Sequence, residues 1–291
     1  MFRNDTLIGK AEKQKSRKAE KYDRGKGITM NLHYELRDHI GIFTLDNPPV
    51  NVWTPELHQR FYELLSDFLS DDQAHVGILT SSGDRAFSAG DDLKTARPAW
   101  SEGELAERYL NGMREGSEIG YPGWEAEVVK LPRTKPVIGA VNGVCLGQGF
   151  IYLDRLTDIR IASENAKFGM VEIAHGMGGA AGGMQLGHSI AHVDAMYLAL
   201  TGEMIDAKKA CDMRLVNEVV APDELMSRAM SIAEKIASHP RLAVRVEMEA
   251  YQATKTMNAE QAMSYANHMF RLLRSTLNNP LPLSDEGKGE S

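Results

Sequence analysis

The sequence predicts an α/β fold followed by a helical C-terminal part, and three observations carry this prediction. Short apolar segments such as HVGILTS and VIGAVNG have the length and composition of strands that are buried on both faces. Longer segments with a single apolar stripe alternate with them along the chain. Beyond about residue 221 the helical pattern continues alone as far as Asn278. Alternating strands and helices are typical of a mostly parallel sheet that helices cover.

The composition bounds the kind of protein. The chain has 291 residues and a formal net charge of −7, which suits one large domain, or one domain with an appendage, and disfavours nucleic acid as the main partner. No apolar run approaches the ~20 residues that cross a bilayer, and none follows the N-terminal charges as in a signal peptide. The cysteines, Cys145 and Cys211, form no CxxC motif and are expected to be buried thiols. We therefore expect a cytoplasmic protein that does not bind a membrane.

Four regions follow from local composition. Residues 1–29 are rich in lysine, arginine and glycine and poor in large apolar side chains, so we expect a disordered tail or an appended leader. The folded core is expected over 30–220, and a helical C-terminal region over 221–278. A polar tail over 279–291 ends the chain.

The first half of the core begins with the strands LHYEL and GIFTLD, which we expect a turn at Asp38 and His39 to join. The next segment, PELHQRFYELLSDFLS, is predicted to be a helix. Its start suits this prediction because the Thr54 hydroxyl can cap it and Pro55 fits the first helical position. HVGILTS then forms a buried strand, and GDRAFSAGDDLK is predicted as a loop with two glycines.

The second half of the core continues the alternation. Residues 95–131 are expected to be mostly helical, with a break at 120–123. VIGAVNG is a strand that leads into the stretch VNGVCLGQGFIYLD, whose glycines precede a helix. The remaining elements are expected to be the strands TDIRIAS, AKFG and LVNEVV, a glycine-rich loop over 176–184, and helices over 184–201, 206–212 and 223–238.

Two segments together carry a family resemblance. They are RAFSAGDDLK, which follows the strand HVGILTS, and KPVIGAVNGVCLGQGFIYLDRLTDIRIASENAKFGMVEIAHGM. Their order and spacing resemble the enoyl-CoA hydratase/isomerase family, the crotonase superfamily, from about Leu32 to about Ser238. The resemblance implies a crotonase-like spiral of ββα units with a helical C-terminal region. This superfamily hosts hydratases, isomerases, decarboxylases, thioester hydrolases and carbon–carbon hydrolases, so the fold does not fix the reaction.

The resemblance implies an oxyanion hole made by the backbone N–H groups of Asp91 and Gln148. Such donors stabilise the negative charge on a carbonyl oxygen when the neighbouring carbon loses a proton, and each contributes about 3 kcal/mol. The glycines before them, Gly90 and Gly147, allow the backbone to approach a ligand closely. The family commonly has glycine where this chain has Gln148, but a backbone N–H needs no particular side chain. The Asp91 carboxylate either forms a solvated Asx turn or has a chemical role of its own.

The resemblance also separates two carboxylate positions. Hydratases of the family use two glutamates, and the first corresponds here to Ile151, which cannot hold a proton. The second lies in FGMVEIAHG and corresponds to Glu172, our main catalytic candidate. A lone carboxylate in an apolar pocket becomes a base near neutral pH and can move a proton between two carbons. The alternative for Glu172 is a surface or ion-paired carboxylate.

Two further groups are possible auxiliaries. Asp154 lies three residues after Ile151, so it either replaces the missing acid or pairs with an arginine such as Arg160. His175 lies about one turn beyond Glu172 and either orients that base or is structural. The substrate is predicted to meet residues of the loops and the helix start: Ala89, Gly90, Lys94, Gly147, Ile151, Trp53 and Tyr121.

Some predicted groups have alternative interpretations or are excluded. Trp53 equally fits a loop that a buried ring anchors. A lid over 109–124 is expected to shape the pocket. No Cys/His cluster has metal-ligand spacing, so no metal is predicted. The glycine-rich GMGGAAGGM lacks the Lys-Ser/Thr of a nucleotide loop and is expected to be a turn.

The C-terminal sequence departs from the family pattern. Many relatives end with a Lys/Arg-Pro run that helps hold the nucleotide end of coenzyme A, and this run is missing here. The sequence predicts an isomerase-like or lyase-like enzyme for an acyl-CoA, with coenzyme A as part of the substrate and no permanently bound cofactor. The alternatives are a retro-Claisen hydrolase of a non-CoA β-diketone and a non-catalytic acyl-CoA-binding relative. The resemblance implies a homotrimer or a dimer of trimers that forms through the helical C-terminal region, 221–278.

Overall fold

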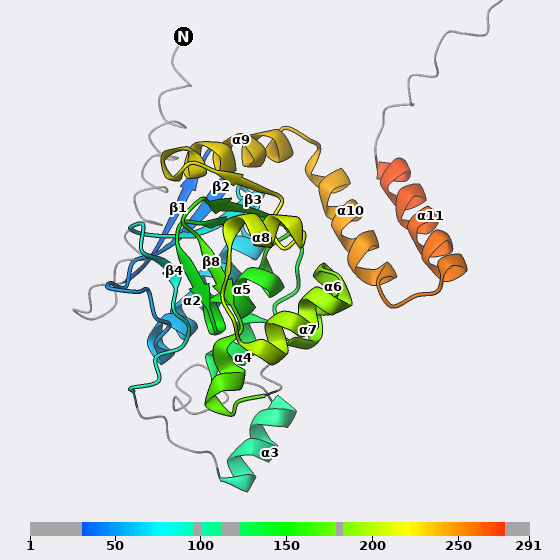
Figure 1. The fold of residues 1–291 in the computed structure, drawn as a ribbon. Helices are drawn as coiled ribbons and strands as arrows, with labels where there is room; N and C mark the ends of the chain where they lie inside the picture. The colour runs from blue at the N-terminus through cyan, green and yellow to red at the C-terminus, as the bar shows by residue number, and fades with distance from the viewer. Residues whose placement is uncertain (1–30, 96–100, 112–122, 179–182, 277–291) are drawn as a thin grey trace, which may run out of the picture. The chain divides into compact units, whose positions relative to one another are not determined.

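The architecture combines a larger and a smaller sheet with surrounding helices (Figure 1). The computed structural model describes residues 31–95, 101–111, 123–178 and 183–276. The tails predicted over 1–29 and 279–291 therefore lie outside the described residues, as do Tyr121 and most of the predicted lid. Among the described residues, no helix is long and apolar enough to cross a membrane.

The larger sheet has six strands in the order β1-β2-β3-β5-β7-β10. Its strands are β1 Leu32–Arg37, β2 Ile40–Leu45, β3 Val76–Ser81, β5 Val137–Val141, β7 Ile159–Ser163 and β10 Glu218–Val220. Only β1 and β2 are antiparallel in this sheet, and the turn between them has Asp38 and His39 at φ 45° and 71°. The predicted hairpin is thus confirmed, and the other pairs are parallel as the buried apolar runs indicate.

The smaller sheet has the order β4-β6-β8-β9 and positions the candidate site. Its strands are β4 Ala86–Ser88, β6 Val144–Leu146, β8 Lys167–Gly169 and β9 Ile205–Asp206. The first three are parallel, and β9 closes the sheet antiparallel to β8. The prediction that GDRAFSAGDDLK is wholly a loop is wrong, because it contains β4. Three residues give too little alternation to mark a strand, so β6 was not predicted either.

Helices and 3₁₀ turns connect the strands. The helices are α2 Pro55–Ser70, α3 Glu102–Asn111, α4 Trp124–Val128, α5 Gln148–Leu156, α6 Gly183–Ser189, α7 His192–Thr201, α8 Ala207–Asp212, α9 Leu225–Ala237, α10 Arg241–Thr254 and α11 Ala259–Thr276, and the 3₁₀ turns are η1 Val171–His175 and η2 Pro222–Glu224. The predicted cap of α2 is confirmed, since Thr54 Oγ1 accepts from Leu57 N at 3.3 Å. The single helix predicted over 184–201 is two helices, with a break after Ser189.

Different helices cover the two faces of the larger sheet. Leu225, Ala229 and Ala233 of α9 pack in one buried cluster with strand residues that alternate along the sheet: Ile40, Ile42, Val76, Ile78, Ile138, Ala140 and Ile161. On the other face, the Phe43 ring lies edge-on to Phe61 and Phe68 of α2, with ring centroids 5.8 and 5.5 Å apart. Each fully buried side chain of this size contributes about 1.5–3 kcal/mol. The core therefore fixes both α2 and α9 against the strands.

The last two helices, α10 and α11, pack against each other (Figure 1). Neither contains a buried residue, and both expose apolar side chains: Leu242, Tyr251, Met263, Phe270 and Leu272. The helical C-terminal region is confirmed as far as Thr276. Its predicted part in a trimer stays a prediction.

Candidate active site

Three neighbouring parallel strands deliver the predicted site residues to one edge of the smaller sheet. Ala89, Gly90 and Asp91 follow β4, Gly147 follows β6, and Glu172 follows β8 within η1. The carboxyl ends of parallel strands lie at the same edge, where ligands of α/β folds commonly bind. The strand pairing therefore brings together Gly90, Gly147 and Glu172, which lie 57 and 25 residues apart in sequence.

The two predicted oxyanion segments touch each other. Gly90 and Gly147 have φ values of 100° and 52°, which favour glycine. A side-chain carbon at Gly90 would lie 3.4 Å from Gln148 N and 3.3 Å from Leu146 O. Gln148 is the first residue of α5, so its N–H has no acceptor within the helix and lies at the positive end of the helix dipole.

The backbone on either side of Asp91 is held by Trp53. Trp53 N donates to Gly90 O at 2.9 Å, and Asp92 N donates to Trp53 O at 2.9 Å. In this parallel bridge the N–H of Asp91 itself points away from Trp53. The bridge therefore directs the Asp91 N–H to the side of the strand opposite Trp53, as an oxyanion donor requires.

Glu172 faces these two segments. Its Oε1 would lie 4.0 Å from a side-chain carbon at Gly147, and its Oε2 is buried without a hydrogen-bond partner among the described residues. Burial raises the pKa of Glu172, and the negative charge of Asp91 raises it further. A hydrogen bond from its own backbone and the nearby His175 oppose this pKa shift. A carboxylate in such surroundings is suited to exchange protons near neutral pH.

A buried hydrogen-bond chain connects helices α5 and α2 to Asp91 at the candidate site. His58 of α2 is fully buried, and its Nε2 lies 2.6 Å from Asp91 Oδ1. Its Nδ1 lies 2.6 Å from the hydroxyl of Tyr152 on α5, which is also fully buried. Sequence reasoning missed His58. The available signal was a polar ring three residues before Phe61, on the apolar stripe of its helix.

The ring of Trp53 does not reach the surface of the site. It is 1% exposed and stacks on Phe61 and His58, with centroids 5.0 and 5.7 Å apart. It also lies edge-on to Tyr152 at 4.9 Å. The prediction that the Trp53 side chain contacts substrate is therefore corrected in favour of the alternative, a ring that anchors its loop.

Asp154 is a structural acid. Its Oδ1 accepts from Arg160 Nη2 at 3.1 Å and from Ser189 Oγ at 2.8 Å, and both charged side chains are buried. Burial lowers the pKa of Arg160, and the Asp154 charge opposes that shift. The predicted pairing with Arg160 is confirmed. The idea that Asp154 replaces the missing acid loses support, because Ile151, itself buried, lies one turn nearer the oxyanion segments.

The remaining predicted contacts are spread around the edge. Ala89 N donates to Val50 O at 2.9 Å, which fixes the loop before Gly90. Lys94 and His175 are exposed, so either side chain is accessible to a ligand. No group of three or more potential metal ligands occurs within the part of the chain that the structure describes.

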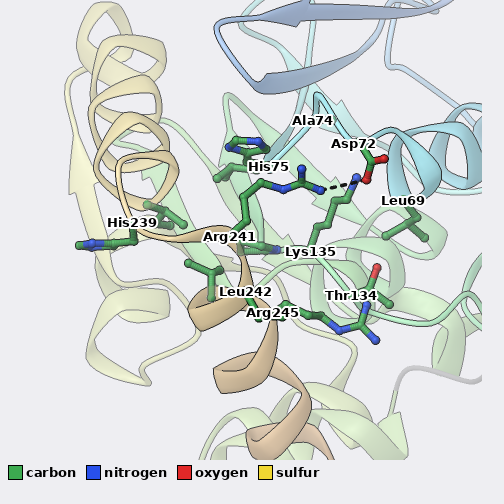
Figure 2. Close-up of a pocket in the computed structure, with 14 residues that line it drawn as sticks. Leu69, Asp72, Ala74, His75, Thr134, Lys135, His239, Arg241, Leu242 and Arg245 are labelled. Atoms are coloured by element: carbon green, nitrogen blue, oxygen red, sulfur yellow. Dashed lines mark hydrogen bonds and ion pairs between the residues drawn. The ribbon is translucent and has the colours of Figure 1, made fainter. Parts of the chain in front are cut away.

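A separate cavity of about 490 Å³ lies at the amino ends of β3 and β5 (Figure 2). Its charged groups have structural partners: Lys135 Nζ donates to Phe68 O and Asp71 O at 2.5 and 2.6 Å, and Arg241 pairs with Asp72 at 3.1 Å. Burial and the nearby Arg241 lower the pKa of Lys135 to about 8. This cavity contains none of the predicted site residues.

The fold is of the crotonase type, and its parallel strand ends bring Gly90–Asp91, Gly147–Gln148 and the half-buried Glu172 to one edge. The comparisons agree with that class. Residues 35–279 match the family model of enoyl-CoA hydratase/isomerase. The chain therefore belongs to the enoyl-CoA hydratase/isomerase family, as its sequence resemblance indicates.

Individual relatives align along most of their length. An (E)-benzylidenesuccinyl-CoA hydratase of Thauera aromatica is 33% identical over 249 residues, which cover 85% of this chain and 92% of the relative. A carnitinyl-CoA dehydratase of Escherichia coli K12 is 30% identical over 239 residues, which cover 82% and 86%. The solved structure of an enoyl-CoA hydratase from Bacillus anthracis superposes with a TM-score of 0.74 at 27% identity, covering 85% of this chain and 92% of that one.

Proposed function

We propose that the protein acts on an acyl-CoA thioester through its enolate, with Glu172 as the group that moves the α-proton. The observation that carries the proposal is the meeting of Gly90–Asp91, Gly147–Gln148 and Glu172 at one sheet edge. The printed names of the relatives, which include a CoA hydratase and a CoA dehydratase, support a CoA thioester over a β-diketone.

In the proposed reaction, backbone N–H groups stabilise the developing charge and a side chain moves the proton. The thioester oxygen accepts from the N–H groups of Asp91 and Gln148, and the dipole of α5 adds to the stabilisation of its negative charge. Each donor is expected to contribute about 3 kcal/mol to the stability of the enolate. Glu172 removes or returns the proton at the α-carbon, as its raised pKa suits.

The reaction class that one glutamate supports is isomerase-like or lyase-like. A single base suffices to shift a double bond, because it returns to one carbon the proton it took from another. With Ile151 in place of an acid, the usual pair of glutamates is not available for water addition. The names of the relatives favour the lyase branch, in which water leaves or enters.

The test is the exchange of α-protons of butyryl-CoA in D₂O, followed by mass spectrometry. We expect Glu172→Gln to lower the exchange rate by about 10²–10⁴-fold, the usual contribution of a positioned acid–base group. The matched control, Glu164→Gln, changes an exposed carboxylate and should leave the rate unchanged. Exchange at the wild-type rate in Glu172→Gln, with butyryl-CoA binding retained in calorimetry, would overturn the proposal.

A further inference from the structure

With Asp91 ionised and His58 neutral, the hydrogen-bond chain Tyr152–His58–Asp91 has one consistent direction. An ionised carboxylate only accepts hydrogen bonds, so His58 donates from Nε2 to Asp91 Oδ1 across 2.6 Å. The neutral imidazole then accepts at Nδ1 from the Tyr152 hydroxyl, also across 2.6 Å. Both ring nitrogens and the hydroxyl are thereby satisfied, which burial requires because an unpaired polar group in the core is costly.

This hydrogen-bond chain ends at the edge of the smaller sheet that carries the candidate site, and not in the core. The Asp91 side chain is 20% exposed, whereas that of His58 is fully buried. Asp91 also lies close enough to Glu172 for its charge to act on that carboxylate. Its backbone belongs to the oxyanion segment that Trp53 holds. The Asp91 carboxylate is therefore held by His58 and is partly exposed at the edge that carries the candidate site.

We propose that Asp91 is the second proton-transfer group of the site and that His58 and Tyr152 are its positioning residues. This assignment rests on the proposed function and refines it: the substrate class is an α,β-unsaturated acyl-CoA, or its β-hydroxy counterpart, that gains or loses water. Asp91 thus supplies, from the β4 side, the carboxyl that Ile151 cannot supply from α5.

The proposed addition balances as follows. Ionised Asp91 takes a proton from water, the water oxygen bonds to the β-carbon, and the π electrons move to the thioester oxygen as an enolate. When the enolate collapses, protonated Glu172 gives its proton to the α-carbon, which becomes saturated. Asp91 is left protonated and Glu172 ionised, and solvent returns the proton from the first carboxyl to the second. Elimination is the reverse sequence.

The buried imidazole has a defined part in this cycle. Asp91 is ionised before it takes the proton from water, and the Nε2–H of His58 donates to that carboxylate. A charge-assisted hydrogen bond of this kind is about twice as strong as a neutral one. The Tyr152 hydroxyl keeps the imidazole in the tautomer that carries its proton on Nε2.

Two assays separate this inference from the proposed function. The first is hydration of crotonyl-CoA and cinnamoyl-CoA, which needs both carboxyls. The second is α-proton exchange of butyryl-CoA in D₂O, which needs Glu172 alone. Asp91→Asn keeps the backbone N–H and a hydrogen-bond acceptor for His58, but it cannot take a proton from water. We expect it to lower hydration about 10²–10⁴-fold and to change the exchange rate far less, because exchange uses the Glu172 carboxyl.

The positioning residues give a graded result. We expect His58→Gln and Tyr152→Phe to lower kcat for hydration, in that order of severity, while KM and the exchange rate stay near the wild-type values. The matched control is Tyr62→Phe. It removes a hydroxyl on the same helix, α2, that takes no part in the Tyr152–His58–Asp91 hydrogen-bond chain. Retained exchange shows in each variant that the oxyanion segments have folded.

Three outcomes overturn the assignment. Hydration at the wild-type rate in Asp91→Asn removes its proton-transfer role. Equal loss of hydration and exchange in Asp91→Asn shows that the carboxyl has no role specific to water addition. A wild-type protein that exchanges α-protons but hydrates neither enoyl-CoA leaves the proposed function standing without this second carboxyl. Loss of the proposed function itself would appear instead as unchanged exchange in Glu172→Gln.

Discussion

Glu172 and Asp154 are both acids in largely apolar surroundings, and the structure treats them in opposite ways. Asp154 accepts from Arg160 and Ser189 at 3.1 and 2.8 Å and holds helix α5 to its surroundings. Asp154 Oδ2 and Glu172 Oε2 are both buried without a hydrogen-bond partner in the described residues, but the Asp154 charge is paired with Arg160, whereas burial raises the pKa of Glu172. The first acid is thus held by a charged partner, and the charge of the second is disfavoured in the folded state.

The largest effect on stability is expected from Asp154→Ala. This change leaves the Arg160 guanidinium buried without its carboxylate partner, which typically costs about 3–5 kcal/mol. Urea unfolding followed by circular dichroism measures the loss.

Glu172→Gln should raise the free energy of unfolding at neutral pH, because it removes a carboxylate whose charge is disfavoured in the folded state. If both variants lose stability equally, the contrast between the two acids is wrong.

A smaller effect is expected from Gly147→Ala, at the turn between β6 and α5. Its φ of 52° disfavours any residue with a side chain by about 1–2 kcal/mol, and the new carbon would lie 3.4 Å from the Cα of Gly90. We expect lower stability and a lower α-proton exchange rate together, since the turn carries the Gln148 N–H. Gly103→Ala in α3, with nothing within 4 Å of the new carbon, is the control and should be neutral or stabilising.

The smallest expected effect is a shift in the pH profile of the α-proton exchange rate. The folded pKa of Glu172 is raised, so its ionised form and the exchange rate increase as pH rises through that value. Asp91→Asn removes a negative charge that raises this pKa, so the rising limb of the exchange profile should move to lower pH. A limb that stays in place, or moves to higher pH, contradicts the electrostatic link between the two carboxylates.

The same pKa gives a stability test. A carboxyl with a raised folded pKa contributes stability that is fully present below its unfolded pKa of about 4.3 and is lost as pH rises through the folded value. The free energy of unfolding of the wild type, relative to Glu172→Gln, should therefore fall as pH rises from about 4 towards neutrality. Denaturation midpoints of the two proteins across that interval measure the trend, and a constant difference would contradict it.

Features that depend on local sequence could be predicted. Thr54 and Pro55 mark the start of α2, and the apolar runs mark the central strands β3 and β5. The Asp154–Arg160 pair spans six residues and was also expected. Helical and strand periodicity carry this information within a window of about ten to eighteen residues.

Features that depend on distant pairing could not be predicted in the same way. The three-residue strands β4 and β6 are defined by their partners and not by their own pattern. The contact of His58 with Asp91 joins positions 33 residues apart, and that with Tyr152 spans 94. The family resemblance located the backbone donors and Glu172, but it gave no place to a histidine on α2.

The bridge between Trp53 and Asp91 has a consequence for how such a site changes over evolution. The two proposed donors are main-chain groups, and Trp53 and the strand ladder hold them through other main-chain groups. The side chains at positions 91 and 148 are therefore replaceable without dismantling the charge stabilisation that the backbone provides. Substitutions at these two positions can therefore change the side chains nearest the proposed ligand while the main-chain donors proposed to stabilise an enolate are kept.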